Sequence, residues 1–269
     1  MSLDTRSPEP LPPPSSSATA LARPVRLRTW LIFWALIGAC LLALLSFNAR
    51  LDTFLWCSTR WFCGDGDNYT WAQYKTAHLA DPVRPFYVAN DPPFAGTFFR
   101  RTEFFWTLCK RCGEPWIVAV VTLLIAAFFR RRRLLAISAL AGMSAAGFLG
   151  WLIRSIDGRY RPTHHDGENH WLLFRGFDLH NNGDLSFPSG HSTLVFSAAA
   201  ALSYCFPRGR PLFIGIACLT AIARVVQEAH FWSDVLFGSA LGWTVTWLLM
   251  QFGDAWFHKR ALRLPQNAG

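Results

Sequence analysis

Residues 134–153, with the sequence LLAISALAGMSAAGFLGWLI, form an apolar stretch without a single charged side chain. An α-helix needs about 20 such residues to cross the ~30 Å hydrocarbon core of a bilayer, so this stretch is long enough to span a membrane. A soluble protein can also bury an apolar helix of this length in its core. The rest of the chain decides between these two environments.

Five more apolar runs lie on either side of this stretch. They cover residues 29–47, 116–129, 192–206, 212–226 and 235–252, and Arg224 is the only charged residue within them. The first and the last are long enough to span a bilayer, whereas the other three need flanking residues to do so. The chain is 52% hydrophobic and has 13 Trp and 23 Phe, which is too apolar for a typical soluble domain. We therefore predict an all-α, polytopic membrane protein with six transmembrane helices and an irregular non-cytosolic loop segment.

The basic residues predict which way the chain crosses the membrane. If all six runs span, the N-terminus, two short loops and the C-terminus lie on one side, and they carry Arg23, Arg26, Arg28, Arg130 to Arg133, Arg208, Arg210, Lys259, Arg260 and Arg263. Short cytosolic loops are rich in Lys and Arg, so both termini are predicted to be cytosolic. This topology accounts for most of the net charge of +9. No basic stripe with interleaved aromatic residues indicates a nucleic-acid partner.

Three segments follow from this topology. Residues 1–27 contain a Pro- and Ser-rich stretch and too few apolar residues to fold, which predicts a disordered cytosolic tail. Residues 28–258 form the predicted six-helix membrane domain, and residues 259–269 form a basic cytosolic tail. Within the domain, residues 48–114 are a long non-cytosolic loop segment rich in Trp and Phe. Such aromatic residues favour the membrane interface, where the loop serves as an anchor or, alternatively, as a lid over a substrate entrance.

Four of the seven cysteines, Cys57, Cys63, Cys109 and Cys112, fall in this loop segment. The compartment outside the cytosol is usually oxidising, so we predict that these four form disulfides. Four cysteines allow three pairings, which the sequence does not distinguish. A zinc or redox role for the pair Cys109 and Cys112 is disfavoured, because no second pair with matching spacing accompanies it.

Three polar clusters map to the predicted non-cytosolic face. They are Arg154 with Arg161, then Ser189 and Gly190 followed by His191, and finally Arg224 with His230 and Asp234. Arginine side chains suit phosphate oxygens, because each guanidinium is always charged and presents a planar set of donors. The residues Ser189 and Gly190 open a predicted helix, whose free N–H groups favour an anion. The clusters therefore predict a site for a phosphate group.

Two histidines complete this site. Asp234 lies four residues after His230, so its carboxylate can hold one ring nitrogen and leave the other as a nucleophile. His191 lies beside the phosphate cradle, where it can protonate a leaving oxygen and later activate water. Three arginines neutralise the transferring group, so we expect neither a metal ion nor another cofactor. The neighbouring loop residues His164, His165, Asp166, Glu168, His170 and His180 have irregular spacings, which disfavours a metal site there.

These residues resemble the motifs of the type 2 phosphatidic acid phosphatase (PAP2) superfamily of membrane lipid phosphatases. The family pattern is Lys, six residues, Arg-Pro; then Pro-Ser-Gly-His; then Ser-Arg, five residues, His, three residues, Asp. This chain has Arg154 to Arg161-Pro162, Pro188-Ser189-Gly190-His191, and Ala223-Arg224 to His230 to Asp234 at the same spacing. Arg154 thus replaces the family's lysine, and Ala223 replaces its serine.

The resemblance implies a residue-by-residue assignment. It implies His230 as the nucleophile, His191 as the general acid, Asp234 as the residue that orients His230, and Arg154, Arg161, Ser189, Gly190 and Arg224 as phosphate binders. It also implies a six-helix membrane phosphatase in a bacterial inner membrane, with its site facing the periplasm or exterior. The expected reaction is metal-independent hydrolysis of a lipid phosphate or diphosphate through a phosphohistidine. The alternatives are a lipid phosphotransferase and a non-catalytic lipid-binding or transport relative; the oligomeric state is left open.

Overall fold

The computed structural model describes residues 28–42, 52, 55, 97–129, 133–159, 161, 185–227 and 229–263. The predicted tail 1–27, most of the loop segment 48–114 and the histidine-rich loop lie outside the described residues. Within them the chain consists of helices and connecting loops, with no β-strand, so the prediction of an all-helical chain is confirmed for this part.

The helices follow one another in a simple order. A first helix, Arg28–Leu42, precedes α3 (Thr97–Arg111), α4 (Trp116–Phe128), α5 (Arg133–Asp157), α6 (Gly190–Cys205), the 3-10 turn η3 (Pro207–Gly209), α7 (Arg210–Val226) and α8 (Trp232–Arg263). Each of the later apolar runs predicted from the sequence thus becomes a helix. α8 continues to Arg263, past the predicted domain boundary at residue 258.

Three of these helices are long and apolar enough to cross a membrane, namely α5, α8 up to Trp256, and η3 joined to α7. α3 and α4 together make a fourth candidate span, bent by 58° at the turn between them. The six predicted spans are therefore not all found: α6 has 16 residues, and Arg28–Leu42 is also short. The run at 212–226, predicted to be short, is lengthened by η3, which starts at Pro207.

Large apolar side chains cover the outer faces of these helices. Leu123 on α4, Phe148 on α5 and Leu212 on α7 are 69%, 59% and 64% exposed. Lipid tails solvate such side chains and water does not, which fits the length and composition of the helices. The chain is therefore an integral membrane protein.

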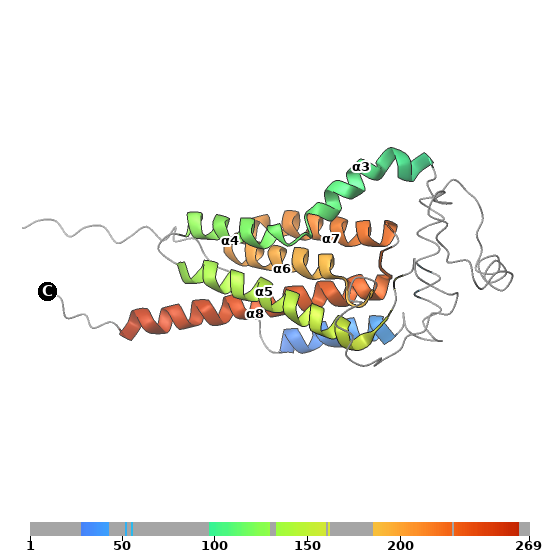
Figure 1. Ribbon diagram of the computed structural model, residues 1–269. Helices are drawn as coiled ribbons and strands as arrows, with labels where there is room; N and C mark the ends of the chain where they lie inside the picture. Colours follow the sequence, from blue (N-terminus) through green and yellow to red (C-terminus); the bar gives the residue numbers. More distant parts are fainter. Residues whose placement is uncertain are drawn as a thin grey trace, which may run out of the picture.

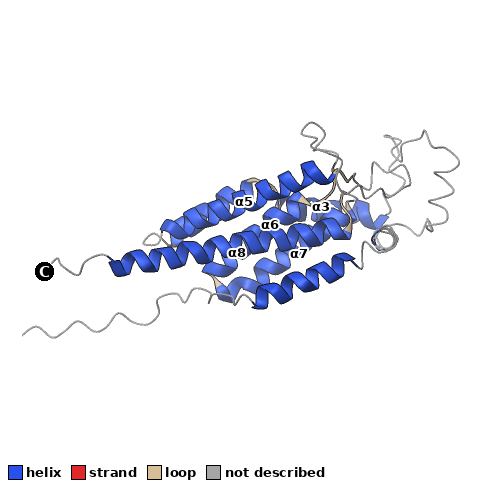
Figure 2. Cartoon of the chain, turned by 90° about the horizontal axis from the view of Figure 1, so that it is seen from below, coloured by secondary structure: helices blue, strands red, loops and turns tan. Residues whose placement is uncertain are grey.

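α6 lies in the middle of the bundle, and α8 packs along both α5 and α6 (Figures 1 and 2). Two glycines on one face of α8 permit the close contact with α6. A Cβ atom at Gly238 would stand 2.7 Å from the Ser189 carbonyl oxygen, and one at Gly242 would stand 2.1 Å from that of Thr193. Small residues at this spacing let two helix backbones approach closely. The first turns of α6 and α8 are consequently held side by side.

The turn between α3 and α4 packs against α6 and α7. The Thr220 hydroxyl of α7 donates a hydrogen bond of 2.8 Å to the Cys109 carbonyl, and a Cβ atom at Gly113 would lie 2.9 Å from that of His191. This packing corrects the disulfide prediction for two of its four cysteines. Cys109 is a buried free thiol, and Cys112, also free, packs against the cluster of Val195, Ala199 and Ala217. Cys57 and Cys63 lie outside the described residues.

Four helix ends meet at one end of the bundle, opposite the end of α8 at Arg263 (Figure 1). They are the last turns of α5 and α7 and the first turns of α6 and α8. The polar clusters predicted from the sequence lie at or next to these four ends, whereas the largest core cluster, between α4, α5, α6 and α8, is hydrophobic.

Candidate active site

His230 lies in the loop just before α8 and Asp234 in the first turn of α8, and both are fully buried. The His230 Nδ1 atom is 3.6 Å from Asp234 Oδ2 and 3.4 Å from the Ser186 hydroxyl, which itself donates to Asp234 Oδ2. The Phe231 N–H also donates to Asp234 Oδ2, over 2.8 Å. With Nδ1 directed at these oxygens, the proton of a neutral ring belongs on Nδ1, which leaves Nε2 with a free lone pair.

His230 is neutral at physiological pH. Burial lowers the pKa of its imidazole to about 4, against the opposing effect of Asp234. A histidine must be unprotonated to act as a nucleophile or as an acceptor of a proton. Its surroundings therefore keep it in the reactive form over the whole neutral range.

Three arginines surround this pair from different elements. Arg154 donates from Nη2 to the Pro188 carbonyl over 2.5 Å, Arg161 donates from Nε to the Leu185 carbonyl over 3.5 Å, and Arg224 donates from Nη1 to Gln227 over 2.8 Å. The charges of the three act on one another, so they lie in one region. The Nε atoms of Arg154 and Arg224 are buried donors without a partner in the described part of the chain. Such a concentration of positive charge suits a polyanionic group.

The seven-residue spacing of Arg154 and Arg161 would place them on one helix face if the helix continued to Arg161, but it ends before that residue. α5 ends at Asp157, and Gly158 follows with a φ of 71°, a left-handed conformation that glycine adopts at helix ends. Arg161 lies in the loop after α5 and not on the helix, yet its charge still acts on that of Arg154, so the two side chains lie close together.

The N-terminus of α6 supplies the remaining predicted residues. Ser189 caps the helix, its side chain accepting from the Ser192 N–H, and its own N–H donates to the Asp234 carbonyl over 3.1 Å. A Cβ atom at Gly190 would lie 3.0 Å from Arg154 Nη2, so glycine permits the arginine to reach the helix start. The N–H groups of a first helical turn have no partner within the helix and favour an anion.

His191 stands in this first turn and is half-buried. Its electrostatic neighbours are Arg224, His230, Lys110 and Arg154. The two histidines thus face the same cluster of arginines, His191 from α6 and His230 from the loop before α8. Lys110, on α3, is a further cation near His191 that the sequence motifs do not include.

Arg159 is the most important residue that sequence reasoning missed. It is 1% exposed and forms ion pairs with Asp234, at 2.6 Å, and with Asp52, at 3.2 Å. Its guanidinium also stacks on the Phe231 ring, 4.0 Å from the centroid. In the sequence Arg159 lies between two motif residues and looks like part of the spacer. A charge in the loop at a membrane face was the available signal, since such a residue needs a partner.

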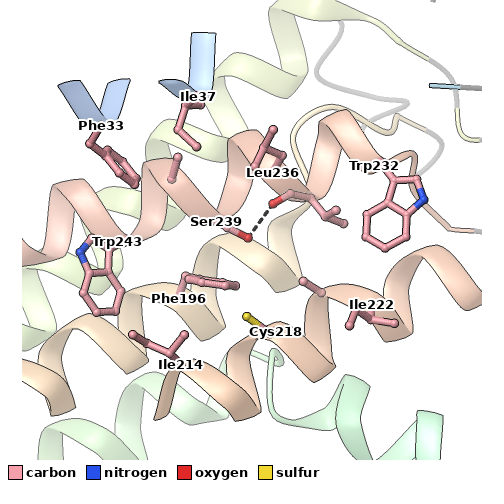
Figure 3. Close-up of a pocket in the computed structure, with 13 residues that line it drawn as sticks. Phe33, Ile37, Phe196, Ile214, Cys218, Ile222, Trp232, Leu236, Ser239 and Trp243 are labelled. Atoms are coloured by element: carbon pink, nitrogen blue, oxygen red, sulfur yellow. Dashed lines mark hydrogen bonds between the residues drawn. The ribbon is translucent and has the colours of Figure 1, made fainter. Parts of the chain in front are cut away.

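An apolar cavity of about 490 Å³ opens beside the site, between the helix Arg28–Leu42, α6, α7 and α8. Figure 3 shows its lining side chains, among them Phe33, Phe196, Cys218, Trp232 and Trp243. Trp232 and Val235 belong to the same turn of α8 as Asp234, so the cavity wall and the polar site share this turn. The cavity can hold an alkyl chain and offers a charged group no partner.

Comparisons with known proteins bear on these residues. Residues 133–257 match the family model described as the PAP2 superfamily. The chain is 42% identical over 98 residues to a lipid A 1-phosphatase of Rhizobium johnstonii, covering 36% of this chain and 39% of that protein. It is 33% identical over 130 residues to a decaprenylphosphoryl-5-phosphoribose phosphatase of Mycobacterium tuberculosis, covering 48% of this chain and 67% of that protein. The chain thus spans well under half of the lipid A 1-phosphatase and about two thirds of the mycobacterial enzyme.

Two solved structures are similar. A transmembrane PAP2-type phosphatidylglycerolphosphate phosphatase from Bacillus subtilis aligns at 19% identity with a TM-score of 0.48, covering 88% of this chain and 98% of that one. LpxE of Aquifex aeolicus aligns at 18% identity with a TM-score of 0.42, covering 62% and 90% of the two chains.

Proposed function

The chain belongs to the PAP2 superfamily, and on this premise we propose that it hydrolyses a lipid phosphate or diphosphate through a phosphohistidine on His230. One observation carries the proposal: the buried, neutral His230 is held by Asp234 and has Arg224, Arg154 and His191 as charged or titratable neighbours. This combination supplies a nucleophile, a residue that orients it, a phosphate cradle and a second acid-base group.

In the first step, His230 Nε2 attacks the phosphorus atom and the bond to the leaving oxygen breaks. His191 donates a proton to that oxygen, which leaves as an alcohol or as a lipid monophosphate. Asp234 stabilises the positive charge that develops on the His230 ring as the N–P bond forms.

In the second step, His191, now unprotonated, removes a proton from a water molecule that attacks the phosphohistidine. The N–P bond breaks, inorganic phosphate leaves, and the electron pair returns to Nε2. Arg154, Arg161, Arg224 and the start of α6 hold the phosphate oxygens in both steps. We infer that this positive charge serves in place of a divalent metal.

A lipid substrate fits the setting of the site. A phosphate bound by the three arginines lies next to the cavity beneath Trp232, which can receive one of the lipid's chains. In the full topology that we propose, the helix Arg28–Leu42 and α6 are completed to spans, which gives six. The site then faces the periplasm or exterior of a bacterial inner membrane, with both termini in the cytosol.

Phosphate release is the first test of this proposal. We expect the purified protein to release inorganic phosphate from at least one member of a panel with lipid A, polyprenyl diphosphate, phosphatidic acid and phosphatidylglycerol phosphate. Activity should persist in excess chelator, because arginines provide the charge stabilisation. Loss of substrate with the phosphate moved to another lipid, without free phosphate, would identify a phosphotransferase. Strict metal dependence would contradict the proposed mechanism.

Cys218 offers a test of the lipid tail's position, because it is exposed and lines the cavity. We expect a long-chain lipid phosphate to slow the labelling of Cys218 by a thiol reagent, since an alkyl chain in the cavity covers the sulfur. Cys40, also exposed but not part of the lining, serves as the control and should react at an unchanged rate. A short-chain phosphate with the same headgroup should protect neither. Equal labelling of Cys218 with and without the long-chain lipid would place the tail elsewhere.

A further inference from the structure

A buried network joins the start of α8 to a distant part of the chain. Arg159 Nη1 donates to Asp234 Oδ1 over 2.6 Å and to the Ser233 hydroxyl over 2.7 Å, while Nη2 donates to Asp52 Oδ2 over 3.2 Å. The Ser233 N–H donates to Asp52 Oδ1, and its hydroxyl to Asp52 Oδ2. All four side chains are essentially fully buried. We call Arg159, Asp52, Ser233 and Asp234 the Arg159 network.

The two carboxylate oxygens of Asp234 have different partners. Oδ1 is taken by Arg159, whereas Oδ2 is left for Ser186, the Phe231 N–H and the His230 ring. A carboxylate fixed in this way cannot rotate to offer a different oxygen. The orientation of the His230 ring thus depends on a residue that does not touch it.

The network also sets how much negative charge His230 experiences. An ion pair with Arg159 offsets part of the charge on Asp234, and Asp52 in turn offsets part of the charge on Arg159. Asp52 accepts from Arg159 and from both donors of Ser233, so both of its oxygens act as acceptors. Arg159 bridges Asp234 and Asp52 with its two terminal nitrogens, which a planar guanidinium allows. The single ammonium group of a lysine does not present two such donors in a fixed geometry.

From this geometry we propose that Arg159, held by Asp52, is a positioning residue that aims Asp234 at His230 and limits the basicity of the nucleophile. The inference rests on the proposed function, because it refines the role of His230. Arg159 is 1% exposed and packs against Asp52, Ser233, Asp234 and the Phe231 ring, so we infer that it acts through Asp234 and not on the substrate.

The helices α5, α6, α7 and α8 each place a charged or titratable side chain near His230, and a test of Arg159 has to leave these side chains unchanged. Asp234 belongs to α8, Arg224 to α7, Arg154 to α5 and His191 to α6. Asp157, at the end of α5, acts on Arg159 and on Asp234. Replacing Arg159 or Asp52 leaves all five in place.

The test is an NMR titration of the histidines in the purified full-length protein, with the His230 signal assigned by its absence in His230→Gln. In the wild type we expect a midpoint of about 4. The double variant Arg159→Met with Asp52→Asn removes the cation paired with Asp234. The Asp234 carboxylate then stabilises the protonated His230 ring more strongly, so the His230 midpoint should rise by about one unit or more. The single variant Asp52→Asn should shift it the opposite way. Arg210→Met is the matched control, because Arg210 also lies over an aromatic ring, that of Trp247, away from the site.

The separate effects on kcat and KM give a second measurement, which distinguishes a positioning role of Arg159 from a merely structural one. Arg159→Lys keeps the charge but cannot hold Ser233, Asp234 and Asp52 at once. We expect its midpoint to stay near that of the wild type, its KM to change little and its kcat to fall by about 10²-fold, the usual cost of a ~1 Å misplacement. The Arg159→Lys variant tests the positioning role of Arg159 even if the double variant does not fold. A wild-type kcat in Arg159→Lys, or an unshifted midpoint in a folded double variant, overturns the inference. A wild-type protein that releases no phosphate contradicts the proposed function instead, and the titration can still be read.

Discussion

His230→Ala should lose on the order of 10⁴-fold or more in kcat, the cost of removing a group that makes the covalent bond. The Asp234 carboxylate cannot replace it as the nucleophile, because its oxygens are already taken up by Arg159, Ser186 and the Phe231 N–H. Phosphate release from the best substrate of the lipid panel measures the loss.

The control for this variant lies on the same helix. His258 is near the other end of α8, so His258→Ala should retain wild-type turnover. His230 is fully buried, and its removal leaves a space, so the thermal transition of each variant should be compared with that of the wild type. Turnover within tenfold of the wild type in a folded His230→Ala protein would rule out this residue as the nucleophile.

His191→Ala should separate the two halves of the reaction. We expect a loss of about 10²- to 10⁴-fold in kcat for a lipid substrate, whose alkoxide leaving group needs a proton. An aryl phosphate with a good leaving group does not need it, so phosphorylation of His230 should continue while hydrolysis stalls. Rapid mixing should therefore show a burst of about one leaving group per enzyme, followed by very slow release of phosphate.

The matched comparison for the burst is Lys110→Met. Lys110 is a charged neighbour of His191 but has no place in the proton transfers, so this variant should turn over steadily without a burst. A His191→Ala protein that hydrolyses the aryl phosphate at the wild-type rate would show that another group activates the water.

The sequence predicts the members of the site better than it predicts their surroundings. His191, His230, Asp234 and the arginines are spaced along the chain by motifs, and the structure brings them to one end of the bundle. Asp52 and Arg159 could not be paired from the sequence, because they lie 107 residues apart and no local pattern links them. The same holds for the hydrogen bond between Ser186 and Asp234, which joins residues 48 positions apart and depends on the packing of α6 against α8.

The differences in the fold also have local physical causes. Gly158 adopts a left-handed conformation and ends α5 at Asp157, which a count of helical turns up to Arg161 does not anticipate. α6 is flanked by Ser189, which caps it, and by η3 with its Pro207, so this apolar run stays shorter than a full span. The position of Cys109 in the predicted non-cytosolic segment 48–114 predicts an oxidising environment, but packing against α7 buries its thiol.

The most direct test of the account is to locate the phosphoryl group on the enzyme. His191→Ala protein mixed with a labelled aryl phosphate and quenched within milliseconds should carry acid-labile, base-stable label on the peptide that contains His230, and no label should appear in His191→Ala with His230→Gln. Label on another residue, or full turnover without any labelled intermediate, would contradict the account.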